Sequence, residues 1–277
     1  MAVSRFILNV SESILIGSAA DGKAVIIEKS PKKQGLFVSG ENQLVCSNHF
    51  QSEAFKKDKK NEEHIEKWHS QYRYERMNQL LDSVDKIDYL DVASILRNKE
   101  GFEGKMIGYG NEKAINQMMA HHGIIFKPED LLVWVSANPC QMGEFVCYDL
   151  NKVFKEYGGL QSDKSIDVVS KTIPEDPFIR TKEFQNYLTF RKLEETVDNK
   201  SNELATDTLS TQLIQEFLES NPDYYLNNYK LAKYYQLKEK YYEAILQYEI
   251  ALSKEVTTVY EVEDINERLK KCRKKIK

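Results

Sequence analysis

Residues 13–29 read SILIGSAADGKAVIIEK, two apolar runs on either side of an Asp21-Gly22 pair. Such a pair between apolar runs is the strongest short-range signal of a β-hairpin, since a tight turn needs residues that tolerate positive φ angles. Ser30-Pro31 ends the second run, and further strands are expected at residues 35–38 and 43–47. The chain is therefore predicted to open with an antiparallel sheet.

Two helices and then three strands are expected in the sequence that follows. Apolar residues at helical spacing predict helices over residues 70–84 and 90–97, and short apolar runs predict strands at 123–126, 131–136 and 145–148. Residues 55–67 carry five lysines and four acidic residues, and this charged stretch is expected to be a solvated loop. These elements together indicate an antiparallel α+β fold.

The composition changes after about residue 179, where leucine, lysine, glutamate and tyrosine dominate at helical spacing and no strand is expected. A helix is predicted over 208–220, and residues 228–256 resemble a tetratricopeptide repeat. The matching positions are Leu231, Ala232, Tyr235, Ala244, Tyr248 and Ala251. Asn228 and Val256 depart from that pattern, so a generic helical hairpin is the alternative, with helices 208–220 and 260–275 as partners or caps. The predicted domains are residues 1–190 and 191–277.

Composition excludes several classes of protein. The chain has 277 residues, 41% of them hydrophobic and 30% charged, which is typical of a folded globular protein. A net charge of −4 gives no basic footprint for nucleic acid, and no apolar run is long enough to span a membrane. The four cysteines lie far apart without a zinc-type spacing, so neither a metal site nor a disulfide framework is indicated. No export signal is visible, and the compartment stays undetermined.

Three segments together are similar to one enzyme family. They are Leu44–Phe50, which contains Ser47-Asn48-His49-Phe50; Ser70–Arg76; and the residues from Ala120 to Leu150 with His121-His122. In this order and spacing they resemble the acyl-coenzyme A:6-aminopenicillanic acid acyltransferase-like proteins, which are N-terminal-nucleophile hydrolases related to the choloylglycine hydrolases. The resemblance covers about residues 5–190. It implies part of an αββα sandwich, followed by the helical tetratricopeptide-like tail.

The resemblance also implies a chemistry. In such enzymes an N-terminal cysteine attacks an amide or thioester, and fixed hydrogen-bond donors stabilise the negatively charged oxygen that forms. Asn48 is then the oxyanion donor and Arg73 the cation beside the nucleophile or the substrate, while His49, Ser70 and His122 contact the substrate. No metal or organic cofactor is implied.

Each of these residues also has a purely structural interpretation. Asn48 can be a turn residue, and Arg73 can be a surface ion-pair partner. His49 and His122 can be core histidines bonded to backbone carbonyls, and Ser70 can cap the helix that it precedes.

The nucleophile is where the sequence departs from the family. No cysteine precedes Cys46, so we expect the chain to be the C-terminal part of such an enzyme and to be inactive alone. Cleavage before Cys46 would create an N-terminal cysteine, but it would place nucleophile and oxyanion donor two residues apart on one strand. That spacing disfavours the idea, because the donor must lie across the substrate carbonyl.

Two functions follow as hypotheses, and a structural α+β domain without activity is the third possibility. The first is an acyltransferase or amidase that acts on a linear acyl amide or an acyl-CoA through an acyl-cysteine intermediate. The second is a non-catalytic scaffold that binds a peptide or protein through its tyrosine-rich tail.

Overall fold

The computed structural model describes residues 12–18, 20, 22–40, 42–120, 122–156, 165–201 and 208–276. The chain forms two compact units. The first unit comprises Met1–Ile95, Ile124–Val135 and Val146–Thr172, and the second unit comprises Leu96–Gly123, Ser136–Phe145 and Ile173–Lys277. The described residues form two antiparallel three-stranded sheets and nine α-helices, so the α+β class is confirmed.

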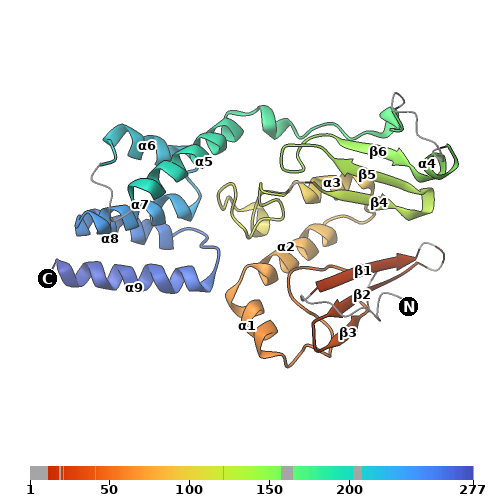
Figure 1. The fold of residues 1–277 in the computed structure, drawn as a ribbon, viewed down its shortest axis with the longest axis horizontal. Coiled ribbons are helices and arrows are strands. Elements are labelled where there is room, and N and C mark those ends of the chain that lie inside the picture. The colour runs from red at the N-terminus through yellow and green to blue at the C-terminus, as the bar shows by residue number, and fades with distance from the viewer. Residues whose placement is uncertain are drawn as a thin grey trace. The chain divides into compact units, whose positions relative to one another are not determined.

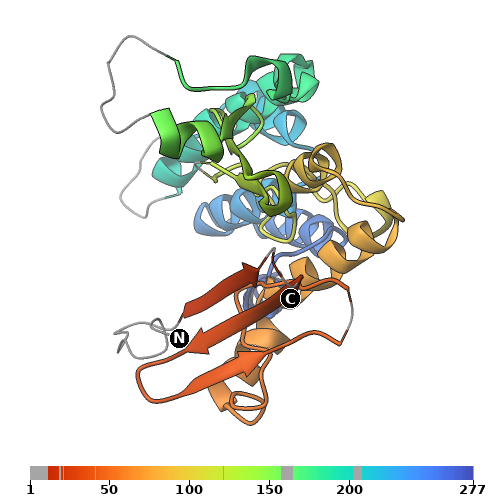
Figure 2. The ribbon, with the colours of Figure 1, turned by 90° about the vertical axis from the view of Figure 1, so that its right-hand side faces the viewer.

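The first sheet contains β1 (Glu12–Ser18), β2 (Lys23–Lys29) and β3 (Gln34–Phe37), in that order. Figure 2 shows the three strands side by side with alternating direction. The predicted hairpin is confirmed, with Leu15 opposite Ile26. Gly22 has a φ of +65°, as the tight turn requires, and Asp21 lies outside the described residues.

The second sheet contains β4 (Ile124–Lys127), β5 (Leu132–Ser136) and β6 (Phe145–Asp149), close to the predicted strands. Trp134 on β5 is completely buried. Its ring stacks on Tyr89 at 4.6 Å, and its indole N–H donates to the carbonyl of Lys171 at 2.8 Å. Trp134 is thus a packing residue of the second sheet.

The helices of the first unit are α1 (Lys59–Lys67), α2 (Ser70–Asp82), α3 (Tyr89–Leu96) and α4 (Leu150–Glu156). The prediction of a loop over 55–67 was wrong for most of that stretch. Asp58 caps α1 by accepting the backbone N–H groups of Lys60 and Asn61. The buried Asn61 side chain exchanges two hydrogen bonds with the backbone of Phe50, which ties the charged helix to the loop before it.

The predicted strand at 43–47 was also wrong. This segment has no ladder partner among the described residues. The Gln51 amide donates to the carbonyl of Val45 at 2.8 Å. The fully buried Glu28 carboxylate accepts the N–H groups of Gln51 at 2.6 Å and Ser52 at 2.9 Å. Residues 43–52 are therefore a loop that is fixed by a carboxylate of β2.

The helices of the second unit are α5 (Lys182–Lys200), α6 (Thr211–Ser220), α7 (Tyr225–Leu237), α8 (Tyr241–Leu252) and α9 (Val259–Lys275). Figure 1 shows α7, α8 and α9 packed in sequence, and the small residues Ala232, Ala244 and Ala251 are fully buried in their seams. The helical hairpin is confirmed, while the tetratricopeptide assignment stays a prediction. The domain boundary predicted at residue 190 falls inside α5, which runs without a break.

Four 3-10 helices occur in the described ranges: Phe102–Gly104, Pro128–Asp130, Val169–Lys171 and Pro177–Arg180.

In the second unit, Glu255 after α8 anchors residues 105–113, which are distant in the sequence. Its carboxylate pairs with Lys113 at 2.6 Å and Lys105 at 3.1 Å, and its backbone carbonyl accepts from the buried Asn111 at 2.9 Å.

Candidate functional site

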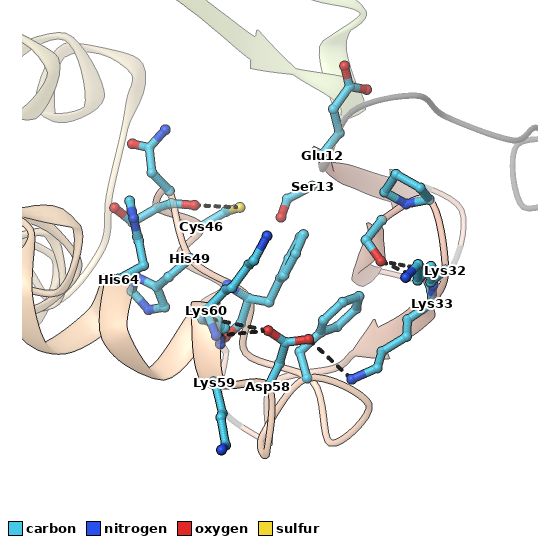
Figure 3. Close-up of a pocket in the computed structure, with 17 residues that line it drawn as sticks. Glu12, Ser13, Lys32, Lys33, Cys46, His49, Asp58, Lys59, Lys60 and His64 are labelled. Carbon is cyan, nitrogen blue, oxygen red and sulfur yellow. Dashed lines mark hydrogen bonds and ion pairs between the residues drawn. The ribbon is translucent and has the colours of Figure 1, made fainter.

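A cavity of about 930 Å³ lies in the first unit. It is lined by the start of β1, the turn between β2 and β3, residues 46–50 and the first turns of α1. Figure 3 shows labelled side chains from all four of these segments around one space. The volume is within the range of roughly 300–1,000 Å³ that is usual for small-molecule sites.

Asn48 lines this cavity, and Arg73 of α2 holds its side chain. The guanidinium of Arg73 donates to Oδ1 of Asn48 at 2.5 Å and lies 3.3 Å from Nδ1 of His69. With its oxygen occupied by Arg73, the amide has its two N–H donors left for other acceptors. Arg73 itself is not among the described residues that line the cavity, so it reaches the site through Asn48.

His49 and Ser70 form a second contact pair. His49 lines the cavity and is nine-tenths buried, and its Nδ1 lies 3.2 Å from the hydroxyl of the fully buried Ser70. Ser70 does not cap α2. It is the first helical residue, and the preceding His69 is the N-cap and makes no side-chain cap bond. The hydroxyl is thus engaged by the histidine rather than by the end of its own helix.

Burial lowers the pKa of His49, and the nearby His64 and Arg73 lower it further, against an opposing effect of Glu28. The pKa of His64 is lowered as well, first by burial and then by His69 and Arg73. Both imidazoles are therefore neutral near pH 7, and a neutral imidazole can accept a proton.

This arrangement predicts the titration of the two histidines. In nuclear magnetic resonance titrations, the imidazole signals of His49 and His64 should give pKa values below the ordinary value of about 6.5. Arg73→Ala should raise both values, because it removes one positive neighbour. Since folding lowers these pKa values, the stability linked to them is complete above pH ~6.5 and is lost as the pH falls below it. Unchanged values in Arg73→Ala would contradict the electrostatic account.

Cys46 is a free, exposed cysteine that also lines the cavity. Figure 3 shows its sulfur pointing toward the hydroxyl of Ser13 on β1. Although the residue as a whole is exposed, partial burial of its sulfur raises the pKa of the thiol. The hydrogen bond with Ser13 lowers this pKa, and the charge of Glu28 raises it further. The thiol is thus protonated at neutral pH and needs a base in order to react.

The rim of the cavity is cationic. Four lysines line it, Lys32, Lys33, Lys59 and Lys60, against Glu12 and Asp58. Lys33 pairs with Asp58 at 3.2 Å, and this hydrogen bond is the main cause that lowers the pKa of the Asp58 carboxyl. Figure 3 shows Lys33 reaching Asp58, whereas Lys59 extends away from the space.

The structure brings together four of the five residues that the sequence singled out. Asn48 and His49 line the cavity, and Arg73 and Ser70 hold them from α2. His122 belongs to the second unit, where it is exposed just before β4, and it does not line this cavity. Ser13 and Glu28 were predicted only as strand residues of the hairpin, without a role in a site.

Comparison with protein-family models, with curated proteins and with solved structures finds no match for this chain. Within the described ranges, no helix combines the length and the apolar character needed to cross a bilayer. The same residues contain no group of three or more His, Cys, Asp or Glu side chains placed to hold a metal ion.

The tyrosines of the tail are mainly structural. Tyr224, Tyr225, Tyr234 and Tyr248 are buried between the helices, and Tyr242 is the strongly exposed exception. The aromatic character of the tail therefore reflects its core more than a binding surface.

Proposed function

We propose that the cavity binds an acyl carbonyl and stabilises the oxyanion formed during acyl transfer, as in an acyltransferase or amidase. The observation that supports this is the fixed amide of Asn48 on the wall of a cavity large enough for a small acyl compound. A donor that is already oriented stabilises developing negative charge without a reorganisation cost. The resemblance to the penicillin acyltransferase-like enzymes gives Asn48 the same role.

Arg73 has two effects in this proposal. It orients the amide, and its positive charge polarises the amide so that the remaining N–H groups become stronger donors. The proposal concerns the half of the site that binds the carbonyl, and it does not depend on which cysteine attacks. The substrates that fit it are linear acyl amides and acyl thioesters.

Binding of a transition-state mimic tests the proposal without requiring turnover. An alkyl phosphonate monoester presents a tetrahedral anionic centre, and the N-alkyl amide of the same length is its neutral counterpart. Asn48→Ala should weaken phosphonate binding by roughly tenfold or more, as expected for loss of a hydrogen bond to a charged group. Amide binding should change by less than about threefold, because the ground-state carbonyl gains less from the donor.

Calorimetric titration of wild type and variants makes the measurement, and Asn42→Ala is the matched control. Asn42 is an exposed asparagine six positions upstream that does not line the cavity. Arg73→Ala should reduce phosphonate affinity by a smaller factor than Asn48→Ala. Equal phosphonate affinity in Asn48→Ala and Asn42→Ala would refute the proposed role of the cavity.

A further inference from the structure

The loop around Cys46 places a thiol, an amide donor and an imidazole on one cavity. In a strand, Cys46 and Asn48 would share one face and His49 would point to the other. The chain is not a strand here, and all three residues line the same space. The sequence analysis disfavoured Cys46 as a nucleophile because it would lie two residues from Asn48 on one strand. That argument does not apply to a loop.

His49 brings an imidazole to the same cavity as this thiol. One ring nitrogen, Nδ1, is engaged by Ser70 at 3.2 Å. Within the described part of the chain, the other nitrogen, Nε2, has no hydrogen-bond partner, although the residue is nine-tenths buried and lines the cavity. When Nδ1 donates its proton to the Ser70 hydroxyl, Nε2 carries the lone pair that a general base needs.

We propose that Cys46 is an acyl acceptor, so that an acyl thioester transfers its acyl group to this internal cysteine. This inference rests on the proposed function, because it uses Asn48 as the oxyanion donor. It adds the reacting atom and assigns His49 as the base and Ser70 as the residue that positions it.

The sulfur of Cys46 attacks the thioester carbonyl while its proton moves to Nε2 of His49, and the oxyanion is bound by the Asn48 amide. The carbon–sulfur bond of the donor then breaks, and the leaving thiolate takes the proton from His49. The products are a thioester at Cys46 and the free thiol of the donor, with no oxidant or reductant needed.

The test is acylation of the full chain by the hexanoyl thioester of N-acetylcysteamine, followed by intact mass and peptide mapping. We expect one hexanoyl group per chain, on Cys46, formed faster than on free cysteine at the same pH. Cys46→Ala should abolish this adduct. Asn48→Ala should slow its formation by roughly 10²–10³-fold, the usual effect of losing an oxyanion donor. Both replaced side chains are exposed, so folding should be retained.

Two further variants separate catalysis from simple reactivity. Cys140→Ala is the matched control, because Cys140 is a free and only partly buried cysteine of the second unit whose loss should leave the adduct unchanged. Ser70→Ala should move the pH dependence of acylation, since it alters the protonation of His49, whereas a merely structural role would leave that profile unmoved. Rate measurements from pH 5 to 9 record it.

Three results would overturn the inference. They are adducts on Cys140 or on lysines in place of Cys46, an unmodified chain, and a rate of Cys46 acylation that is the same in Asn48→Ala as in wild type. The phosphonate titration is a separate measurement. Phosphonate binding that depends on Asn48, together with an unmodified Cys46, would reject this inference and leave the proposed function standing.

Discussion

Tyr248→Ala is expected to lower the free energy of unfolding of the second unit by about 3–5 kcal/mol, the usual cost of removing a large buried aromatic ring. Tyr248 on α8 has no exposed surface and lies 6.4 Å from the ring of Tyr229 on α7. Its hydroxyl donates to Oε1 of Gln236 at 2.6 Å. The substitution removes packing between two helices and leaves the Gln236 acceptor without this donor.

Urea unfolding followed by circular dichroism measures the loss, and the same helix provides the control. Tyr242→Ala makes an identical substitution at a residue that is 71% exposed, and it should change stability by no more than about 0.5 kcal/mol. Tyr248→Phe keeps the ring and should cost only about 1 kcal/mol for the hydrogen bond. If Tyr248→Ala and Tyr242→Ala unfolded at the same urea concentration, the described packing of α7 and α8 would be wrong.

Glu28→Ala should destabilise the first unit by about 2–5 kcal/mol. The Glu28 carboxylate is fully buried and accepts the N–H groups of Gln51 and Ser52. Each donor that loses its partner in a buried position costs about 1–3 kcal/mol. Because these two bonds hold the loop that carries Cys46, Asn48 and His49, the variant should also lose the cavity.

Hydrogen exchange gives the local readout for this variant. The amides of Gln51 and Ser52 should exchange faster in Glu28→Ala than in wild type, and phosphonate binding should weaken. Glu53→Ala is the control, since the Glu53 side chain is 85% exposed in a surface pair with Lys56 and should contribute little. Unchanged amide exchange in Glu28→Ala would mean that the carboxylate does not hold the loop.

Local signals were enough to predict much of the fold. The Asp21-Gly22 pair and its apolar flanks predict the hairpin, and the spacing of apolar residues predicts α2, α3 and α6 to α9. The prediction failed at α1, because the many charged residues were interpreted as a loop although Asp58 is an ordinary N-cap. Asp58 followed by a helix with a Lys67–Glu63 pair is a readable signal.

The site was predictable in part, and the reason is the range of its contacts. Arg73 and Asn48 are 25 residues apart, and His49 and Ser70 are 21 apart, so no local pattern places them together. Only the resemblance to a family of known arrangement suggested it. Cys46 was set aside because the sequence predicted a strand, whereas the true loop depends on a carboxylate from β2 that no motif contains.

The anchoring of residues 105–113 by Glu255 has a consequence for biosynthesis. Asn111 and Glu255 are 144 residues apart, so the ribosome needs roughly 7–30 s to make the second after the first. During that interval Lys105, Asn111 and Lys113 cannot yet make their bonds to Glu255. The second unit can therefore close only after Glu255 has been made, and until then residues 105–113 are open to chaperones and proteases.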